Sequence, residues 1–279
     1  MIIIDGNNWC WRANWVGREL TSKGRRTGVL HIGFSMLLAM HDLFQEQRIM
    51  FLWDHKDSWR KKLYPAYKAN RQADPERVKE RTEVYRQIGL FREVLSAVGI
   101  TQVEEQGLEA DDIAGIISTR CHLSDRPLTM VSSDKDWYQL LTSSNRIVKG
   151  WTGKKLEEFH AEDVLKKFGV TIENWPKYQA LLGESGDNIP KVCRGMGPVT
   201  ACKVLAGVLP LPPEYQVQYE LNLKLTTLRR EGKLTHKWPE QSKEGWKFLE
   251  GILTDYELSD LWVSRAKLWQ LGKWGRSRA

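Results

Sequence analysis

The sequence has few cysteines, and their spacing indicates neither a cross-link nor a zinc site. The four cysteines stand at positions 10, 121, 193 and 202, and no two of them form a C-x-x-C motif. This usage fits a reducing cytoplasm and argues against a disulfide scaffold. Long apolar runs are also missing, because none approaches the roughly 18 residues that a membrane-spanning helix needs. The start, Met-Ile-Ile-Ile-Asp, lacks the basic and apolar regions of a signal peptide.

Two further absences narrow the classes of fold and enzyme that the sequence can represent. The sequence contains no internal repeat or low-complexity tract, and no serine–histidine–aspartate pattern or catalytic cysteine stands out. What is present is a 279-residue chain that is 41% hydrophobic and carries a formal net charge of +7. This length suits one large domain or a core with a smaller appendage. The positive charge favours an anionic partner, although many basic proteins bind no nucleic acid.

Three apolar runs end in aspartate. Residues 2–5, 49–54 and 128–134 each read as a short buried strand, and the last is followed by a second acid, Asp136. Continuous apolar runs of this kind are typical of parallel strands that are covered on both faces. Ligands of open α/β sheets bind beyond the carboxyl ends of such strands. The alternative for a single residue such as Asp5 is a turn or helix-capping aspartate.

The densest group of acids lies in the segment Leu108 to Gly115. Glu109, Asp111 and Asp112 precede an apolar run, which suits the first turn of a helix whose dipole favours negative charge. Three carboxylates so close to a core edge repel one another, and a divalent cation would neutralise them. Oxygen-only ligands favour Mg²⁺ or Mn²⁺ over zinc. The alternative is a solvated, acid-rich helix start.

Basic and aromatic residues follow the second strand. The segment 56–71 contains six lysines and arginines but only one acid, and Trp59, Tyr64 and Tyr67 lie among them. Positive charge attracts a phosphate backbone, and aromatic rings can stack on unpaired bases. A helix is predicted over 75–98, because Asp74 and Pro75 form a favourable cap and first-position pair. Helical spacing also predicts helices over 24–45 and 159–167.

A change in character begins near residue 175. The segment Gly183-Glu184-Ser185-Gly186-Asp187-Asn188-Ile189-Pro190 is followed by Gly195-Met196-Gly197-Pro198 and a helix to Leu205. A G-x-G turn between helices exposes backbone N–H groups, which can hold a phosphate without reading bases. An ordinary helix–turn–helix corner is the alternative.

Nine carboxylates could converge at one end of the sheet. They are Asp5, Asp54, Glu109, Asp111, Asp112, Asp134, Asp136, Glu184 and Asp187. So many acids cannot share a site at neutral pH without cations. Two metal ions about 3.5–4 Å apart would neutralise much of this charge and could support in-line attack on a phosphodiester. A structural calcium site would explain the acids but not the nearby basic stretch.

These motifs, taken together, resemble the flap endonucleases, a group of structure-specific 5′-nucleases. The group includes bacteriophage 5′–3′ exonucleases and the 5′-nuclease domain of bacterial DNA polymerase I. The matching motifs occur in family order over residues 1–207 and are Ile4-Asp5-Gly6-Asn7, Trp53-Asp54, Arg60 with Tyr67-Lys68-Ala69-Asn70-Arg71, Glu109-Ala110-Asp111-Asp112, Ser133-Asp134-Lys135-Asp136, and Gly183 through Gly197. The chain departs from the family in carrying Glu184 where Asp is usual, and in one extra residue between Asn-Ile-Pro and G-x-G.

The resemblance implies an α/β, PIN-like fold with a mainly parallel central sheet flanked by helices. It divides the chain into a metal-dependent nuclease core over 1–174, with a helical arch at about 64–92, and a helical DNA-binding region over 175–279. That region would contain a helix–three-turn–helix element at about 183–205 and a C-terminal extension.

The resemblance also implies a role for each motif residue. Asp5, Asp54, Glu109 and Asp111 would hold one Mg²⁺ or Mn²⁺ ion, with Asp112 nearby, and Asp134, Asp136, Glu184 and Asp187 would hold or surround a second. Lys68 and Arg71 would act on the scissile phosphate. Tyr67 would stack on a terminal base, and Arg60, Gly195, Gly197, Thr200 and Lys203 would also contact nucleic acid. The helix–three-turn–helix element often binds K⁺ in relatives.

The expected enzyme is therefore a monomeric, divalent-metal-dependent phosphodiesterase of a bacterial or phage-infected cell's cytoplasm. It would cleave branched DNA near a single-stranded 5′ end, in replication or repair, with 5′–3′ exonuclease activity. Cleavage of the RNA strand of an RNA–DNA hybrid, as in RNase H, is a further possibility that the resemblance leaves open. Two alternatives remain at this stage: a PIN-like ribonuclease and a non-catalytic DNA-binding protein.

Overall fold

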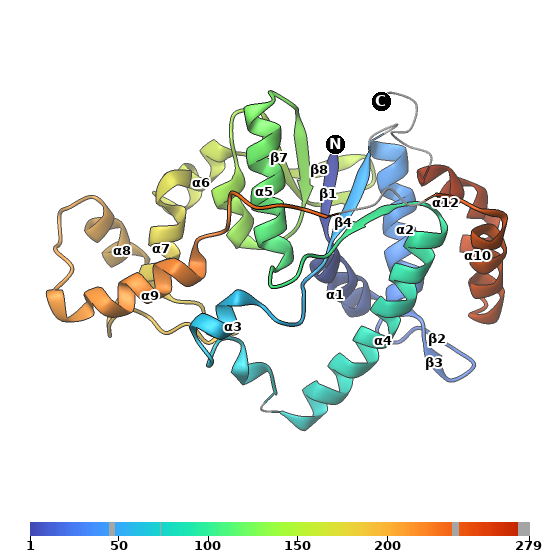
Figure 1. Ribbon diagram of the computed structural model, residues 1–279, viewed down its shortest axis with the longest axis horizontal. Helices are drawn as coiled ribbons and strands as arrows, with labels where there is room; N and C mark the ends of the chain where they lie inside the picture. The colour runs from blue at the N-terminus through green and yellow to red at the C-terminus, as the bar shows by residue number, and fades with distance from the viewer. Residues whose placement is uncertain (45–47, 73, 236–239, 273–279) are drawn as a thin grey trace.

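A six-stranded sheet forms the centre of the computed structural model, which describes residues 1–44, 48–72, 74–235 and 240–272 (Figure 1). The strand order is β5-β4-β1-β6-β7-β8, and all neighbouring pairs are parallel except β7 with β8. The strands are β1 (Ile2–Asp5), β4 (Ile49–Leu52), β5 (Thr101–Val103), β6 (Leu128–Val131), β7 (Asn145–Thr152) and β8 (Lys155–Phe159). The expected mainly parallel sheet is confirmed.

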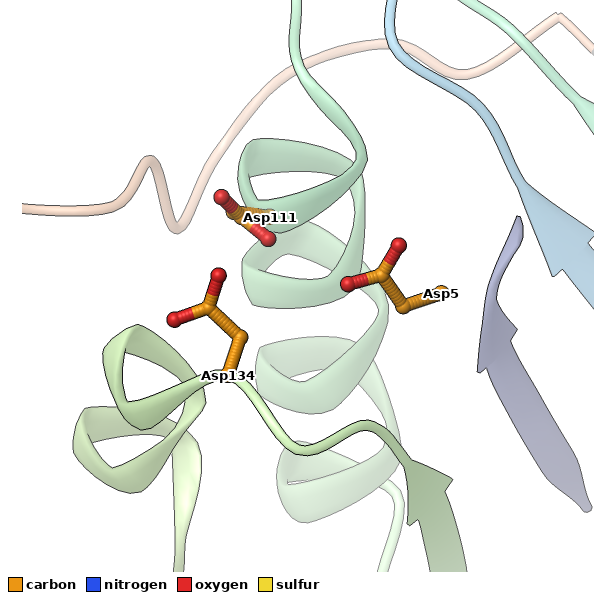
Figure 2. Close-up of side chains that lie close together, drawn as sticks. All are labelled: Asp5, Asp111 and Asp134. Carbon is orange, nitrogen blue, oxygen red and sulfur yellow. The ribbon is translucent and has the colours of Figure 1, made fainter. Parts of the chain in front are cut away.

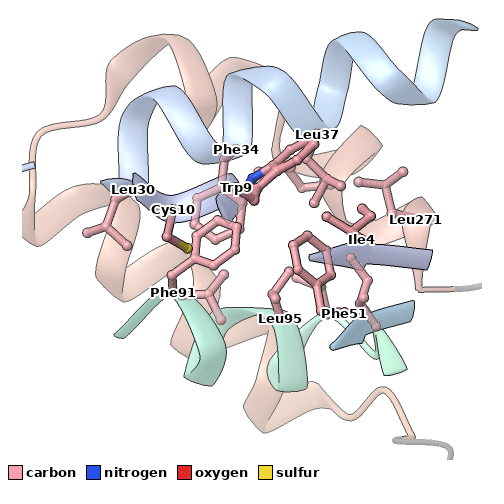
Figure 3. Close-up of a cluster of buried hydrophobic side chains, with 14 of the residues drawn as sticks. Ile4, Trp9, Cys10, Leu30, Phe34, Leu37, Phe51, Phe91, Leu95 and Leu271 are labelled. Carbon is pink, nitrogen blue, oxygen red and sulfur yellow. The ribbon is translucent and has the colours of Figure 1, made fainter. Parts of the chain in front are cut away.

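Both faces of this sheet are covered by apolar side chains. Ile2 and Ile4 of β1 belong to one buried cluster and Ile3 to the other, and all three side chains are fully buried. Successive side chains of a strand point to opposite faces, so a run of isoleucines supplies both clusters at once. Figure 3 shows the first cluster, to which Ile4, Phe51 and Phe91 belong.

Helices form the outer layers on the two sides. The first cluster is completed by α1 (Gly6–Val16), α2 (Gly28–Leu43), α4 (Pro75–Ala97), α10 (Lys243–Asp255), α11 (Ser259–Val263) and α12 (Arg265–Leu271). The second is completed by α5 (Ala110–Leu123), the 3₁₀ helix η2 (Lys135–Leu140), α6 (Ala161–Phe168), α7 (Trp175–Leu182), α8 (Pro198–Leu205) and α9 (Gln216–Thr226). In Figure 1, α8 and α9 lie at one end of the molecule and α10 and α12 at the other. Because residues of α10 and α12 share a cluster with Ile4, the C-terminal helices pack into the core of residues 1–174.

The long helix α4 begins where its sequence predicts. The Asp74 side chain accepts the N–H of Glu76 at 3.0 Å, and Pro75 takes the first helical position. Only the second half of α4 enters the core, from Val84 through Leu95, while its first two turns are exposed on every side. The C-terminal half of α4 is therefore anchored in the core, and its first two turns lie away from the sheet.

Two sequence expectations about local structure are wrong. The helix predicted from residue 24 begins only at Gly28, because a hairpin of β2 (Thr21–Ser22) and β3 (Arg25–Arg26) precedes it. Its two loop residues, Lys23 and Gly24, have φ of 50° and 73°, as a tight hairpin requires. The helix predicted from residue 159 begins at Ala161, and strand β8 precedes it. Among the described residues, no helix is long and apolar enough to cross a membrane.

The packing of α5 allows a direct test of this architecture. A Cβ atom on Gly115 would lie 2.1 Å from the carbonyl oxygen of Arg229, whereas one on Gly89 of α4 would meet nothing within 4 Å. We expect Gly115→Ala to lower the free energy of unfolding by about 1–3 kcal/mol because the backbone near Arg229 must move. We expect Gly89→Ala to raise it by roughly 0.5–1 kcal/mol through helix propensity. Urea unfolding of both variants measures the difference, and equal effects would contradict this packing.

Candidate functional site

Acidic residues lie at the carboxyl ends of three adjacent strands. Asp5 is the last residue of β1, Asp54 follows β4 by two residues, and Asp134 follows β6 by three. Asp5 also caps α1, because its Oδ1 accepts the N–H of Asn8 at 2.9 Å. Asp134 caps η2 in the same way, accepting the N–H of Asp136 at 2.9 Å. Helix capping and a role at the sheet edge therefore coincide in these residues.

Three carboxylates meet at this edge. Oxygen atoms of Asp5, Asp111 and Asp134 all lie within 4.8 Å of one another, and Figure 2 shows the three side chains grouped between β1, α5 and η2. Asp111 comes from the first turn of α5 and accepts the indole N–H of Trp137 at 2.6 Å. Asp5 accepts the hydroxyl of Ser132 at 3.1 Å. Fixed donors therefore orient the group.

In this cluster, which we call the three-acid group, burial and the mutual repulsion of the carboxylates outweigh the positive charge nearby. Burial, reinforced by Asp54 and Asp134, raises the pKa of Asp5 to about 7. Burial, together with Asp134 and Asp5, raises the pKa of Asp111 well above its ordinary value. Buried carboxylates of this kind must either hold protons or face a cation. The donor set consists only of oxygens, so it fits a hard divalent cation such as Mg²⁺ or Mn²⁺.

Other predicted acids surround the three-acid group without joining it. Asp54 accepts the N–H of Ala110 at 2.9 Å, and Asp136 accepts the side-chain amide of Gln179. Burial and Asp134 raise the pKa of Asp136 to about 8. Glu184 is exposed and accepts the N–H of Gly186 at 3.3 Å. After burial itself, the charges of Asp187 and Glu184 help to raise the pKa of Asp134, so these acids contribute to one negative field.

Asp112 and Arg60 form a buried ion pair. Asp112 is fully buried, and its carboxylate accepts both terminal nitrogens of Arg60, at 2.8 and 3.0 Å, and the indole N–H of Trp59 at 2.9 Å. Although burial acts in the opposite direction, the Arg60 guanidinium lowers the pKa of Asp112. In this structure Asp112 is therefore the ion-pair partner of Arg60. Arg60 is only 2% exposed, so little of its side chain is open to a ligand.

Tyr67 is also more deeply buried than a base-stacking residue should be. Its side chain is 4% exposed, and its hydroxyl lies 3.0 Å from Glu109 and 2.9 Å from Asp187. Burial, together with these two carboxylates, raises the pKa of Tyr67. Its ring packs in a small cluster with Ile189 and Leu225. Stacking of Tyr67 on a terminal base is therefore not supported by the structure, and the residue instead joins two acids.

Lys68 and Arg71 lie beside two of the acids, Glu109 and Asp187. The Lys68 ammonium is 3.0 Å from Glu109 and 3.7 Å from Asp187, and Arg71 is 2.5 Å from Asp187. Although burial opposes it, the attraction of Glu109 and Asp187 raises the pKa of Lys68. Lys68 has φ of 58°, and its backbone N–H donates to the Asp187 carbonyl at 2.9 Å. A left-handed lysine costs free energy, and such strain is concentrated at functional sites.

A cavity of about 940 Å³ opens onto these residues. Asp54, Tyr67, Lys68 and Glu109 contribute to its lining. Further lining residues come from α4 and from the basic stretch, namely Lys56, Lys61, Arg71, Val78, Arg81, Thr82, Tyr85, Ile88 and Arg92. Two of the predicted acids, Asp54 and Glu109, and the basic stretch therefore face one space.

The G-x-G segment lies in the loop between α7 and α8. Gly195 has φ of 82°, and Gly197 is the N-cap residue of α8. Thr200 is half-buried and Lys203 is exposed on this helix. A buried residue that sequence reasoning missed, Asn222 of α9, donates to the carbonyls of Ala180 and Pro190 at 2.8 and 2.7 Å. Nothing in the sequence distinguishes this asparagine from a solvent-exposed one.

The electrostatics of the three-acid group yield a prediction. Asp111→Asn keeps an oxygen for the Trp137 indole but removes one of the mutually repelling charges. Without metal, we expect its free energy of unfolding to rise by about 1 kcal/mol, which would raise Tm by roughly 2–4 °C. Titration with Mg²⁺ or Mn²⁺ should then stabilise the variant less than the wild type, because a ligand is lost. Thermal unfolding with and without metal measures both effects.

The matched control is Glu240→Gln, which neutralises an exposed acid outside the site. It should follow the wild type in both conditions. A lower Tm for Asp111→Asn without metal, combined with a wild-type response to metal, would contradict the proposed cation site.

Comparison with known proteins agrees with this geometry. DNA polymerase I of Pseudomonas aeruginosa is 31% identical over 210 residues, which cover 75% of this chain and 22% of the polymerase. DNA polymerase I of Deinococcus radiodurans is 29% identical over 263 residues, which cover 92% of this chain and 26% of the polymerase. The chain therefore spans about a quarter of the length of these relatives.

Solved structures show the same fold at low sequence identity. The T5 5′-exonuclease with bound zinc ions aligns with a TM-score of 0.65 at 23% identity, covering 81% of this chain and 88% of that one. Flap endonuclease-1 from Methanococcus jannaschii aligns with a TM-score of 0.63 at 14% identity, covering 98% and 92%. The expected PIN-like fold is confirmed. The family model described as 5′-3′ exonuclease, N-terminal resolvase-like domain, matches residues 1–169. Because this match covers more than half of the chain, the protein belongs to that family.

Proposed function

We propose that the protein is a divalent-metal-dependent 5′-nuclease that hydrolyses phosphodiester bonds near the junction of single-stranded and duplex DNA. The observation that carries this proposal is the three-acid group, whose neighbour Asp54 lines a cavity together with Lys68 and Arg71. Buried carboxylates that repel one another suit metal ions, and adjacent cations suit the phosphate that those ions would act on. Membership of the 5′-3′ exonuclease family supports the same reaction.

The residues divide into two sets of proposed ligands. Asp5, Asp54, Glu109 and Asp111 would hold one ion, and Asp134, Asp136, Glu184 and Asp187 would hold or surround the second. When bound, such a pair of ions supplies an activated water and stabilises the charge that develops on the phosphoryl oxygens. Asp112 is left out of both sets because Arg60 and Trp59 occupy it.

Lys68 and Arg71 would hold the scissile phosphate. In the structure they pair with Glu109 and Asp187, which are themselves proposed metal ligands. Once these carboxylates turn to a metal, the two cations can donate hydrogen bonds to the phosphate oxygens. Cations placed in this way stabilise negative charge that is larger in the transition state than in the substrate.

The cavity and the α7–α8 loop suggest how the substrate is held. We propose that a single-stranded 5′ end enters the cavity beneath the arch formed by residues 64–92. The backbone amides of Gly195 and Gly197, with Thr200 and Lys203, would hold a phosphate of the adjoining duplex, because an exposed helix start favours anions. A K⁺ ion in the helix–three-turn–helix element at 183–205 is part of the same proposal.

The proposed setting is DNA replication or repair in a bacterial or phage-infected cell's cytoplasm, with the protein acting as a monomer. Action on the RNA strand of an RNA–DNA hybrid remains a secondary proposal. Contacts to phosphate oxygens do not by themselves distinguish DNA from RNA, because the two differ at the sugar 2′-hydroxyl. The experiment below therefore includes an RNA substrate.

The primary test uses a 5′-labelled DNA flap, a matched flush duplex and an RNA flap, each with Mg²⁺ and with EDTA. We expect metal-dependent release of the flap as one fragment. A variant with alanine at both Asp134 and Asp136 should bind the flap and leave it uncut. Short 5′ products would identify an exonuclease, and preferential RNA cleavage would favour the ribonuclease alternative. Binding without cleavage of any substrate in Mg²⁺ or Mn²⁺ would refute the proposal.

A second prediction separates catalysis from binding. Lys68→Ala should slow single-turnover cleavage roughly 100-fold or more, since a transition-state charge contact is lost. Its effect on flap affinity should stay within about threefold, since a single phosphate contact contributes little to binding. The matched control is Lys61→Ala, which removes the same charge from another part of the cavity lining. Equal losses of cleavage and binding in Lys68→Ala would contradict its proposed role.

A further inference from the structure

An aromatic cluster joins α1 to the middle of α4. Trp11 of α1 and Tyr85 of α4 contact each other edge to face, with ring centroids 6.3 Å apart and an interplanar angle of 88°. The Arg81 guanidinium lies 5.5 Å from the Trp11 ring and 5.8 Å from the Tyr85 ring, and it donates to the Tyr85 hydroxyl at 3.3 Å. The orientation of Tyr85 is therefore fixed by two neighbours.

Tyr85 is nevertheless largely open to its surroundings. Its side chain is 48% exposed, whereas the other tyrosine near the acids, Tyr67, is 4% exposed. Tyr85 and Arg81 both line the cavity that also contains Asp54, Lys68 and Glu109. A fixed aromatic ring that is about half exposed, in a cavity that also holds the proposed catalytic groups, can receive a planar ligand.

We propose that Tyr85 is a stacking platform for an unpaired base of the 5′ strand, held in place by Trp11 and Arg81. The inference rests on the proposed nuclease function and specifies what the cavity recognises. An aromatic ring can stack on any base whose face is free, and stacking is tolerant of sequence. A base inside a duplex has both faces covered by its neighbours. Tyr85 would thus favour unpaired over paired 5′ ends, while Arg81 keeps positive charge beside the strand.

The test compares variants on substrates that do and do not carry bases. With a flap of ordinary nucleotides, Tyr85→Ala should lower kcat/KM roughly tenfold, whereas Tyr85→Phe, which keeps the ring, should stay within about twofold of the wild type. When abasic nucleotides replace those of the flap, the wild type should lose a similar factor. Tyr85→Ala should then lose no more, because the ring and its partner base are two halves of one interaction.

The matched control is Phe248→Ala, which removes an exposed ring from α10, away from the cavity lining. It should behave as the wild type on both flaps. An equal loss for Tyr85→Ala on ordinary and abasic flaps would overturn the proposal, because the residue would then act through the shape of α4. Cleavage of ordinary flaps by Tyr85→Ala at the wild-type rate would also overturn the proposal, because the ring would then contribute nothing.

A second readout does not depend on cleavage. A flap carrying 2-aminopurine is bound in Ca²⁺, and its fluorescence falls when the base stacks. Wild type and Tyr85→Phe should quench the probe at one or two flap positions, and Tyr85→Ala should leave it bright at matched saturation. Quenching that is the same in all variants would overturn the platform. Absence of cleavage by every form, with quenching that still depends on Tyr85, would refute the nuclease function but retain the stacking site.

Discussion

Arg60 is a buried cation that connects three separate parts of the chain near the acidic centre. From α3 (Trp59–Leu63) it reaches Asp112 and Glu109 at the start of α5, and its Nε donates to the Leu225 carbonyl of α9 at 2.7 Å. A buried charge is tolerated only when its partners hold it in good geometry, and removing one partner of such a pair costs about 3–5 kcal/mol. This requirement fixes the start of α5 relative to α3. It thereby fixes Glu109, the carboxylate that Lys68 also contacts.

The same constraint separates two kinds of acid that are neighbours in the sequence. Asp112 has a guanidinium and an indole within hydrogen-bond distance, and its pKa is lowered. Asp111, one residue earlier, points to the other side of the helix turn, where burial and the acids Asp134 and Asp5 raise its pKa. One carboxylate is compensated within the protein, whereas the other requires a proton or a cation from outside. The distinction follows from which side of the first helical turn each side chain occupies.

The grouping of acids at the carboxyl ends of the strands could be predicted from the sequence, because each strand carries its own signal. Apolar runs ending in Asp5, Asp54 and Asp134 place the acids together once the strands are parallel. The partners of individual side chains could not be predicted in this way. In the sequence, Arg60 is one of several basic residues in a row, yet it pairs with residues about 50 positions away. The hairpin at 21–26 and strand β8 were missed for a similar reason, since short strands depend on neighbours and carry little periodicity of their own.

Lys68 and Arg71, which line the cavity, already pair with Glu109 and Asp187, two of the acids proposed to hold metal ions. Glu109 is shared by Arg60, Lys68 and Tyr67, and Asp187 is shared by Tyr67, Lys68 and Arg71. If Glu109 and Asp187 held a divalent cation, as proposed above, Lys68 and Arg71 would be able to donate hydrogen bonds to a phosphodiester instead. Each charge would then exchange one partner for another and would not be left buried alone, which would be costly. With these ligands, metal and substrate would favour each other's binding, because each would provide a partner for the groups that the other displaces.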